Sequence, residues 1–256
     1  AVIFRRFVQS LKDQNWTAIA IEFVLLVLGV FLGIQAANWN EARAFDALER
    51  DHLLNLRAEI EKDIETTHAR KNLYAGVHAA GERALAFIES DQACTGNQCW
   101  SLLVDFFHAS QWIDVGVNRT TYAEMLRIGL PRSRELALEI NPYFSQNATI
   151  NSIPNERPAY RILVRGLIPL QAQQAMWADC HQGVGGIMTF NNDCPAGISS
   201  EQAERAVERI RHHPDIAPTL TQWTSTVAPI VKYLGGNDDY AGRAIAAIDK
   251  ALESRP

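Results

Sequence analysis

Four cysteines, in two close pairs, are the residues whose chemistry the sequence constrains most. Cys94 and Cys99 form a C-x4-C pair, and Cys180 and Cys194 form a C-x13-C pair. An even number of cysteines in an oxidising compartment favours disulfide bonds. The alternative is a four-cysteine zinc site, with His181 as an extra candidate ligand, but the two gaps do not repeat the short doublets of such sites. We therefore expect each pair to form a disulfide bond.

Other side chains capable of catalysis show no pattern that predicts an enzyme. The seven histidines are scattered, and neither an HExxH nor a G-x-S-x-G motif is present. We expect His108 to be a core or boundary histidine. Residues 183–186 lack the Lys-Ser/Thr of a phosphate-binding loop, and Asp238-Asp239 lacks calcium-loop spacing and is interpreted as a helix cap. We expect no catalytic residue, no metal site and no cofactor.

Composition narrows the class of protein further. The chain has 256 residues, which fits one or two domains with a sizeable core. It carries 24 basic against 29 acidic residues, a formal net charge of −5. Nucleic-acid binding calls for a basic face, so this balance argues against a nucleic-acid partner.

The apolar residues are concentrated in one early segment, residues 17–38, between Trp16 and Trp39. Twenty-two helical residues span about 33 Å, enough to cross a hydrocarbon core of about 30 Å. Tryptophans at both ends are typical of the two membrane interfaces. The uninterrupted apolar part, residues 23–34, is short, which leaves a signal peptide or a buried core helix as alternatives. We predict a retained transmembrane helix at 17–38.

The charges on either side of this segment predict its orientation. Residues 1–16 carry three basic side chains and a single acid, whereas the residues just after Asn40 are mixed and lean towards acids. By the positive-inside rule the N-terminal tail, residues 1–16, is cytoplasmic. Residues 39–256 then form an extracytoplasmic domain. The expected location is the inner membrane of a bacterium, with this domain in the periplasm and the lipid bilayer as one partner.

One face of the predicted membrane helix combines an acid with small residues. At about 100° per residue, Gly29, Gly33 and Asn40 fall within roughly 20° of Glu22. Small residues let another helix approach closely, and acids within a membrane usually face protein. We expect Glu22, Gly29, Gly33 and Asn40 to contact another integral membrane protein or a second copy of the chain. The alternative is a monomeric anchor whose Glu22 reaches the cytoplasmic headgroups.

The rest of the chain shows helical periodicity and almost no strand-like alternation, which predicts an all-α fold. A long amphipathic helix should follow the membrane segment as far as Ser90, with a possible break at Gly76 or Gly81. Further helices, which would form a bundle, are expected at 100–112, 120–130, 133–144, 159–180 with a kink at Pro169, 199–212, 216–234 and 238–254. Capping boxes are expected at Thr121–Glu124 and Ser199–Gln202, and residues 181–197 should be a loop.

Two stretches resemble a known family. The first runs from Glu22 to Glu41 and ends in Asn38-Trp39-Asn40-Glu41. It resembles the membrane segment of a family of uncharacterised bacterial single-pass membrane proteins, with an acid, an apolar run containing glycine, and then Asn-Trp-Asn-Glu. Residues 120–130, followed by Arg134-Glu-Leu, resemble that family's second segment. The resemblance covers roughly the first 145 residues; it implies topology and helical content and brings no activity.

We expect the protein to be a non-catalytic, membrane-anchored accessory or scaffold subunit that docks on a larger membrane protein complex. Its transmembrane face and its periplasmic helical domain would make the contacts. The alternative is a periplasmic ligand-binding or sensor domain held on a membrane anchor. An enzyme is the third class, and no motif supports it.

Overall fold

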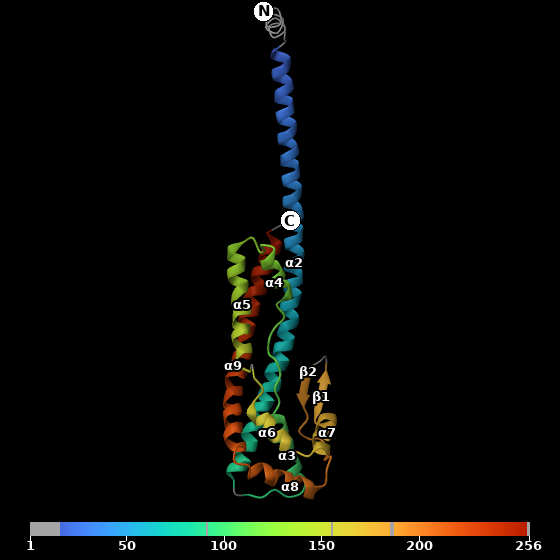
Figure 1. The fold of residues 1–256 in the computed structure, drawn as a ribbon, viewed down its shortest axis with the longest axis vertical. Helices are drawn as coiled ribbons and strands as arrows, with labels where there is room; N and C mark the ends of the chain where they lie inside the picture. Colours follow the sequence, from blue (N-terminus) through green and yellow to red (C-terminus); the bar gives the residue numbers. More distant parts are fainter. Residues whose placement is uncertain (1–15, 91, 155, 185–186, 255–256) are drawn as a thin grey trace, which may run out of the picture. The chain divides into compact units, whose positions relative to one another are not determined.

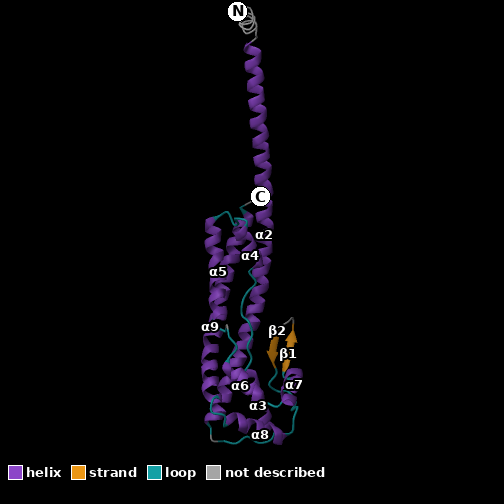
Figure 2. Cartoon of the chain, viewed as in Figure 1, coloured by secondary structure: helices purple, strands orange, loops and turns teal. Residues whose placement is uncertain are grey.

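The computed structural model describes residues 16–254, apart from residues 91, 155, 185 and 186. These residues form eight α-helices and one two-stranded sheet (Figures 1 and 2). The chain divides into two compact units, Ala1–Asp51 and His52–Pro256, and helix α2 (Trp16–Glu89) runs through both. The mainly helical fold and the long apolar N-terminal helix are as predicted, whereas the small sheet contradicts a purely α-helical fold.

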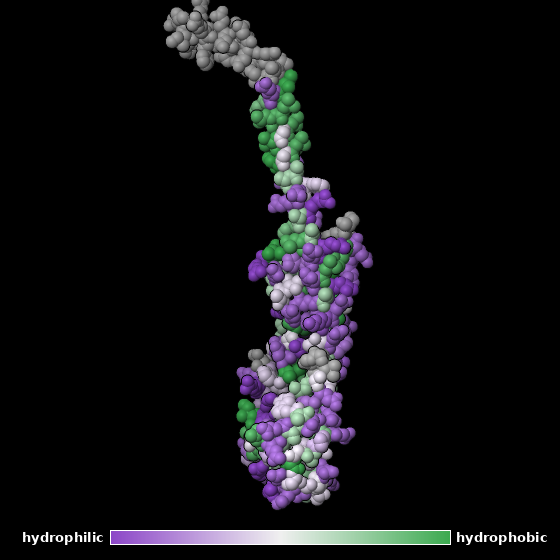
Figure 3. All heavy atoms as spheres, turned by 90° about the vertical axis from the view of Figure 1, so that its right-hand side faces the viewer, coloured by the Kyte–Doolittle hydropathy of each residue, from purple (hydrophilic) through white to green (hydrophobic). Residues whose placement is uncertain are grey.

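The described part of the first unit is helical from Trp16 onward. Its large apolar side chains are exposed on every side of the helix, and none packs into a core. They are Ile21, Phe23, Val24, Leu25, Leu26, Val27, Leu28, Val30, Phe31, Leu32 and Ile34. Figure 3 shows these hydrophobic atoms gathered on the helix beside the grey residues. By length and composition, α2 is the one described helix that could cross a membrane.

Three long helices lie side by side in the second unit: the second half of α2, α5 (Arg134–Ser152) and α9 (Ile216–Glu253) (Figure 1). Besides apolar packing, polar contacts between side chains join these helices. Asn147 of α5 donates a hydrogen bond of 3.0 Å to the side-chain oxygen of Asn237 of α9. Arg57 of α2 pairs with Asp249 of α9, with 2.6 Å between Nε and Oδ1. These contacts fix the register of the long helices.

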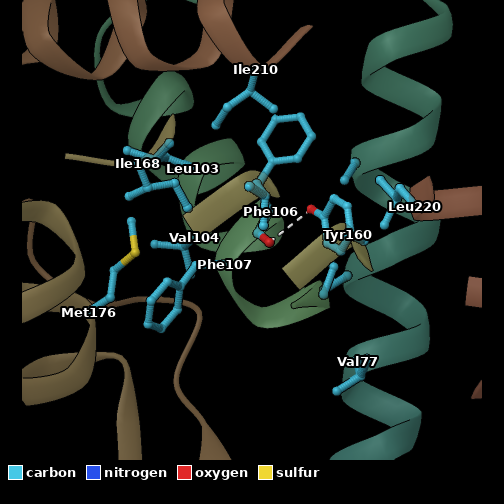
Figure 4. Close-up of a cluster of buried hydrophobic side chains, with 14 of the residues drawn as sticks. Val77, Leu103, Val104, Phe106, Phe107, Tyr160, Ile168, Met176, Ile210 and Leu220 are labelled. Atoms are coloured by element: carbon cyan, nitrogen blue, oxygen red, sulfur yellow. Dashed lines mark hydrogen bonds between the residues drawn. The ribbon is translucent and has the colours of Figure 1, made fainter. Parts of the chain in front are cut away.

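A second set of helices packs around α3 (Asn97–Ala109), which is buried from Cys99 to Trp100 and again from Leu103 to Ala109. The set consists of α6 (Ala159–Leu167), α7 (Leu170–Asp179) and α8 (Ser200–Arg211). Figure 4 shows this core, in which the buried Tyr160 hydroxyl donates a 2.9 Å hydrogen bond to the carbonyl of Phe106. Because nearly all of α3 is buried, it acts as the central element of this part of the unit.

The region predicted to be a loop contains an antiparallel β-hairpin. Strands β1 (His181–Val184) and β2 (Ile187–Phe190) pair with His181 opposite Phe190. Each strand has only four residues, His-Gln-Gly-Val and Ile-Met-Thr-Phe, and neither alternates apolar with polar residues. The prediction of a loop at 181–197 was therefore wrong for the hairpin residues.

The glycines expected to break helices instead allow close packing. Helix α2 is continuous through Gly76 and Gly81, and α9 is continuous through residues 235–237. A Cβ atom at Gly76 would lie 2.7 Å from the ring of Phe190, and one at Gly81 would collide with the hydroxyl of Thr224. Tertiary contact outweighs the cost of glycine inside a helix, about 1 kcal/mol, so both predicted breaks were wrong.

Several helix ends also differ from the predictions. Helix α4 (Thr120–Arg127) has no capping box at Thr121; the side chain of Asn118 accepts the hydrogen bond from the Thr120 amide instead. Helix α5 extends to Ser152, past the expected end at Phe144. Pro169 separates α6 from α7 and does not kink a single helix. Asp238 lies inside α9, where it pairs with His68 of α2 at 2.9 Å and caps nothing. The capping box at Ser199–Gln202 is confirmed.

Candidate functional site

The four residues predicted to form the contact face of the membrane segment lie on the exposed surface of α2. Glu22, Gly29, Gly33 and Asn40 are all exposed, and a Cβ atom at either glycine would have no neighbour within 4 Å. At about 100° per residue the helix places the four on one face. That face therefore has room for a second helix to approach the backbone.

The two tryptophans predicted at the membrane interfaces bound the same stretch. Trp39 is 63% exposed, and the guanidinium of Arg43 lies 4.7 Å from the centre of its ring. Such a cation on an indole face is attracted by the ring quadrupole, and the two side chains form a polar-aromatic group next to the apolar run. Helix α2 begins at Trp16, whose side chain lies outside the described residues.

The cysteines pair as expected. Cys94 and Cys99 are bridged with 5.1 Å between their Cα atoms, and Cys180 and Cys194 with 5.0 Å. Both separations lie within the usual range for a disulfide. The second bridge joins the end of α7 to the residues that follow β2, so it closes the chain around the hairpin. The pairing accounts for all four cysteines and leaves no free thiol.

An aromatic cluster that the sequence did not predict surrounds His181, at the start of β1. The imidazole of His181 stacks on Trp177 at 4.6 Å and meets the rings of Phe107, His108 and Phe190 edge-on at 5.0–5.6 Å. His181 Nδ1 lies 2.9 Å from the Met176 carbonyl oxygen, and its Nε2 lies 3.1 Å from the Gln111 side-chain nitrogen. With a proton on Nδ1, the neutral ring satisfies both contacts.

Two arginines of α6 adjoin this cluster. Arg161 donates a hydrogen bond of 2.7 Å to the carbonyl of Ser110, and Arg165 donates one of 2.7 Å to the Ser110 hydroxyl. The Arg165 guanidinium lies 3.6 Å from the centre of the Phe107 ring. Its Nη2 is buried without a hydrogen-bond partner in the part of the chain that the structure describes.

Burial and repulsion from a neighbouring arginine lower the pKa of both arginines. Burial, with a smaller contribution from the charge of Arg161, lowers the pKa of Arg165 to about 9. Burial also lowers the pKa of Arg161, together with repulsion from Arg157. A cation with a carboxylate partner is stabilised in its charged form. The described residues place no carboxylate in an ion pair with either arginine, so each is a cation without an anion.

His108 is the most buried titratable group of the cluster, with no exposed surface. Its ring stacks on Phe190 at 4.1 Å, and its Nδ1 lies 3.1 Å from the side-chain oxygen of Asn192. Burial lowers the pKa of His108 to about 4, with a further contribution from His181. The imidazole is therefore neutral at pH 7, which confirms the expectation of a core histidine.

A carboxyl pair on α2 lies in the second unit. Burial, followed by the charge of Glu59, raises the pKa of Asp63 to about 6. The hydroxyl of Tyr143 lies 3.5 Å from Asp63, and both carboxylate oxygens of Glu59 are buried without a partner among the described residues. The described residues contain no group of three His, Cys, Asp or Glu side chains placed to hold a metal ion.

Comparison with known proteins found no matching family model, no matching curated protein and no matching solved structure. The resemblance of residues 22–41 and 120–136 to a family of bacterial membrane proteins therefore stays an expectation from the sequence motifs alone.

Sequence reasoning missed the two α6 arginines, although a signal for them was present. Residues 157–178 contain three arginines and no aspartate or glutamate, in a chain that has 29 acidic residues. The arginines also recur every fourth residue, at 157, 161 and 165; the last two lie on one side of α6, and Arg157 precedes that helix.

Proposed function

We propose that the protein is a non-catalytic, single-pass membrane protein that acts as an accessory or scaffold subunit of a larger membrane protein complex. One observation carries this proposal: between Ile21 and Ile34 the large apolar side chains of α2 are exposed around the whole helix. An amphipathic helix that covers a soluble core exposes only its polar face. A helix that is apolar on all sides calls for lipid or protein around it.

The disulfides support the assignment of the second unit to an oxidising compartment. Structural disulfides persist in the periplasm and outside the cell, and they are rare in the cytosol. The basic residues that precede the apolar segment favour a cytoplasmic N-terminus. Both arguments give the same topology, in which residues 39–256 are periplasmic and the apolar helix spans the inner membrane of a bacterium.

The contact face supports a role in docking. Without a hydrophobic driving force between helices in lipid, association depends on close packing and on polar contacts. Gly29 and Gly33 supply open backbone, and Glu22 supplies a carboxylate that is costly to leave facing lipid. A partner helix that packs on the glycines and donates a hydrogen bond to Glu22 satisfies both. The partner is another integral membrane protein or a second copy of the chain.

A ligand-binding or sensor role is the second candidate, because the second unit has a hollow of a suitable size. It measures about 530 Å³ and lies between the end of α5, the start of α6 and α9. Small-molecule sites are commonly about 300–1,000 Å³. Polar side chains line it, among them Glu156, Arg157 and Gln222. The hydroxyls of Ser152, Thr219 and Thr226, however, already donate to nearby carbonyls, which favours the docking role.

Fusion reporters test the topology. Alkaline phosphatase is active only outside the cytoplasm, so a fusion after Pro256 should be active. A fluorescent protein that folds only in the cytoplasm should stay dark at the same position. The reverse pair of results would contradict the proposed orientation and the compartment assigned to the disulfides.

Substitutions on the contact face test docking. Gly29→Leu with Gly33→Leu fills the space that small residues leave for a partner helix. Val27→Leu adds bulk about 140° away around the helix and is the matched control. The size of the complex, solubilised in mild detergent, is read on a native gel beside the amount of inserted protein. The glycine double variant should lose the partner at normal insertion, and the control should keep it. An unchanged complex in the double variant would leave a simple anchor.

A further inference from the structure

The stretch of chain that contains α6 and most of α7 is basic, between Glu156 and Asp179. Residues 157–178 include Arg157, Arg161 and Arg165 and no acid, although the chain as a whole has a net charge of −5. The segment also contains no lysine. The described residues form no ion pair with any of the three arginines. None of the three therefore has an ion pair like those of solvent-facing arginines elsewhere in the fold, such as Arg127 with Glu124 and Arg205 with Glu201, although Glu156 precedes Arg157 and lines the same hollow.

The surrounding structure holds two of these arginines in place. Arg161 and Arg165 are both bound to Ser110, at the end of α3, and Arg165 is stacked on the ring of Phe107. Each guanidinium has five N–H groups, and these contacts use only a few of them. Side chains that are already ordered lose little entropy when they bind a partner. The two arginines are thus preorganised; because Nη2 of Arg165 is buried, the remaining donors of Arg161 and those of the exposed Arg157 would meet a partner.

Exposed apolar side chains adjoin the arginines. Ile162 on α6 is 66% exposed, and Leu170 and Trp177 on α7 are 71% and 42% exposed. Leu170 and Trp177 are seven residues apart in the helix, so they share one face. The Arg165 guanidinium lies 5.3 Å from the centre of the Trp177 ring, which makes the cationic and the apolar parts continuous. We call Arg157, Arg161, Arg165, Ile162, Leu170 and Trp177 the arginine–tryptophan surface.

We propose that the arginine–tryptophan surface is a second docking site, outside the membrane, for an acidic segment of a partner protein that also carries aliphatic side chains. The inference rests on the proposed function, because it assumes a partner complex. Arginine binds carboxylates through two parallel hydrogen bonds. Arginine and tryptophan are also the residue types that contribute most to binding at protein interfaces.

The structure favours a protein partner over a lipid surface. The Trp177 ring is packed against His181 and Phe107, at 4.6 and 5.4 Å, so it is fixed in place and not free to insert into a bilayer. Segments that bind anionic lipids by charge are commonly clusters of four to eight basic residues, whereas this segment has three arginines. Three cations, two of them held by Ser110, flanked by Leu170 and Ile162, match a short acidic and aliphatic peptide.

Binding of a defined peptide tests the charge and the apolar requirement. The probe is a fluorescent peptide of alternating glutamate and leucine, added to the full chain in zwitterionic nanodiscs. Arg157→Glu with Leu170→Ser changes two exposed side chains that hold no other part of the fold, and it should weaken binding about tenfold. Arg127→Glu with Leu138→Ser makes the same changes on exposed residues of α4 and α5 and should leave binding unchanged. No binding, or equal losses in both variants, would overturn the proposal.

Cross-linking in the native membrane identifies the occupant. A photo-reactive amino acid at Leu170 of the full chain should cross-link to a partner peptide that contains acidic residues, and Arg157→Glu should reduce the yield of that cross-link. Cross-links to lipid, to a second copy of the chain or to a neutral peptide would overturn the proposal, as would none at all. If the cross-link to an acidic peptide is not found but the complex is intact on the native gel, only the proposal for the arginine–tryptophan surface is contradicted. Loss of the complex from the wild-type chain would instead remove the proposed function.

Discussion

Protonation of His108 should destabilise the second unit in acid. The imidazole is fully buried, and it fits its site as the neutral form, stacked on Phe190 with Nδ1 directed at Asn192. Burial lowers its pKa from an ordinary value of 6.5 to about 4. Between these two values the unfolded chain binds a proton that the folded chain does not. Folding stability therefore falls as the pH drops through this window.

The size of this effect follows from the two pKa values. Each pKa unit corresponds to about 1.4 kcal/mol. The difference between 6.5 and about 4 therefore corresponds to a loss of stability of about 3 kcal/mol that His108 causes between pH 7 and pH 4. That is a large part of the about 5–15 kcal/mol that typically stabilises a domain.

His108→Phe isolates this contribution. The ring can still stack on Phe190, but it cannot be protonated, and the hydrogen bond to Asn192 is lost at a cost of about 1 kcal/mol at every pH. Guanidinium unfolding of the full chain in detergent, followed by tryptophan fluorescence, gives the free energy of unfolding at each pH. The free energy of unfolding of the wild type minus that of the variant should fall by about 3 kcal/mol between pH 7 and pH 4. A difference that stays constant with pH would refute the burial of a neutral His108.

Four further changes test other parts of the structure. The raised pKa of about 6 means that the charged form of Asp63 is costly in the folded chain, so the wild type should gain stability on acidification. Asp63→Asn should raise stability above pH 6 and remove that gain. Thermal unfolding at pH 5 and pH 8 checks both outcomes. Gly76→Ala should destabilise by about 1–2 kcal/mol, because its methyl group would press on the aromatic ring of β2. Gly166→Ala, with open space around it, should be neutral or stabilising in the same denaturation assay. Replacing Cys180 and Cys194 by serine should lower the free energy of unfolding by about 2–3 kcal/mol without changing membrane insertion, as measured by denaturation and by fractionation.

Local patterns predicted the helices and the disulfides well. The Ser199 capping box depends on residues close in sequence and was found as expected. The cysteine pairs are likewise close in the chain. Signals of this kind do not require knowledge of distant contacts.

Features that depend on tertiary contact could not be predicted. Gly76 and Gly81 look like helix breakers in the sequence, but their missing side chains make room for Phe190 and Thr224, from far along the chain. The cluster around His181 unites residues of α3, α6, α7 and the hairpin. Only the fold brings Arg165 onto Phe107, so no spacing rule in the sequence identifies that pair.

Docking through the membrane helix is the central claim, and the mass of the protein extracted from its native membrane tests it most directly. The full chain is released in mild detergent, and the mass of the intact species is measured by native mass spectrometry. We expect a species heavier than one chain that dissociates in the Gly29→Leu, Gly33→Leu variant and persists in Val27→Leu. A wild-type species with the mass of a single chain, with or without bound lipid, would contradict the claim and leave α2 as a membrane anchor alone.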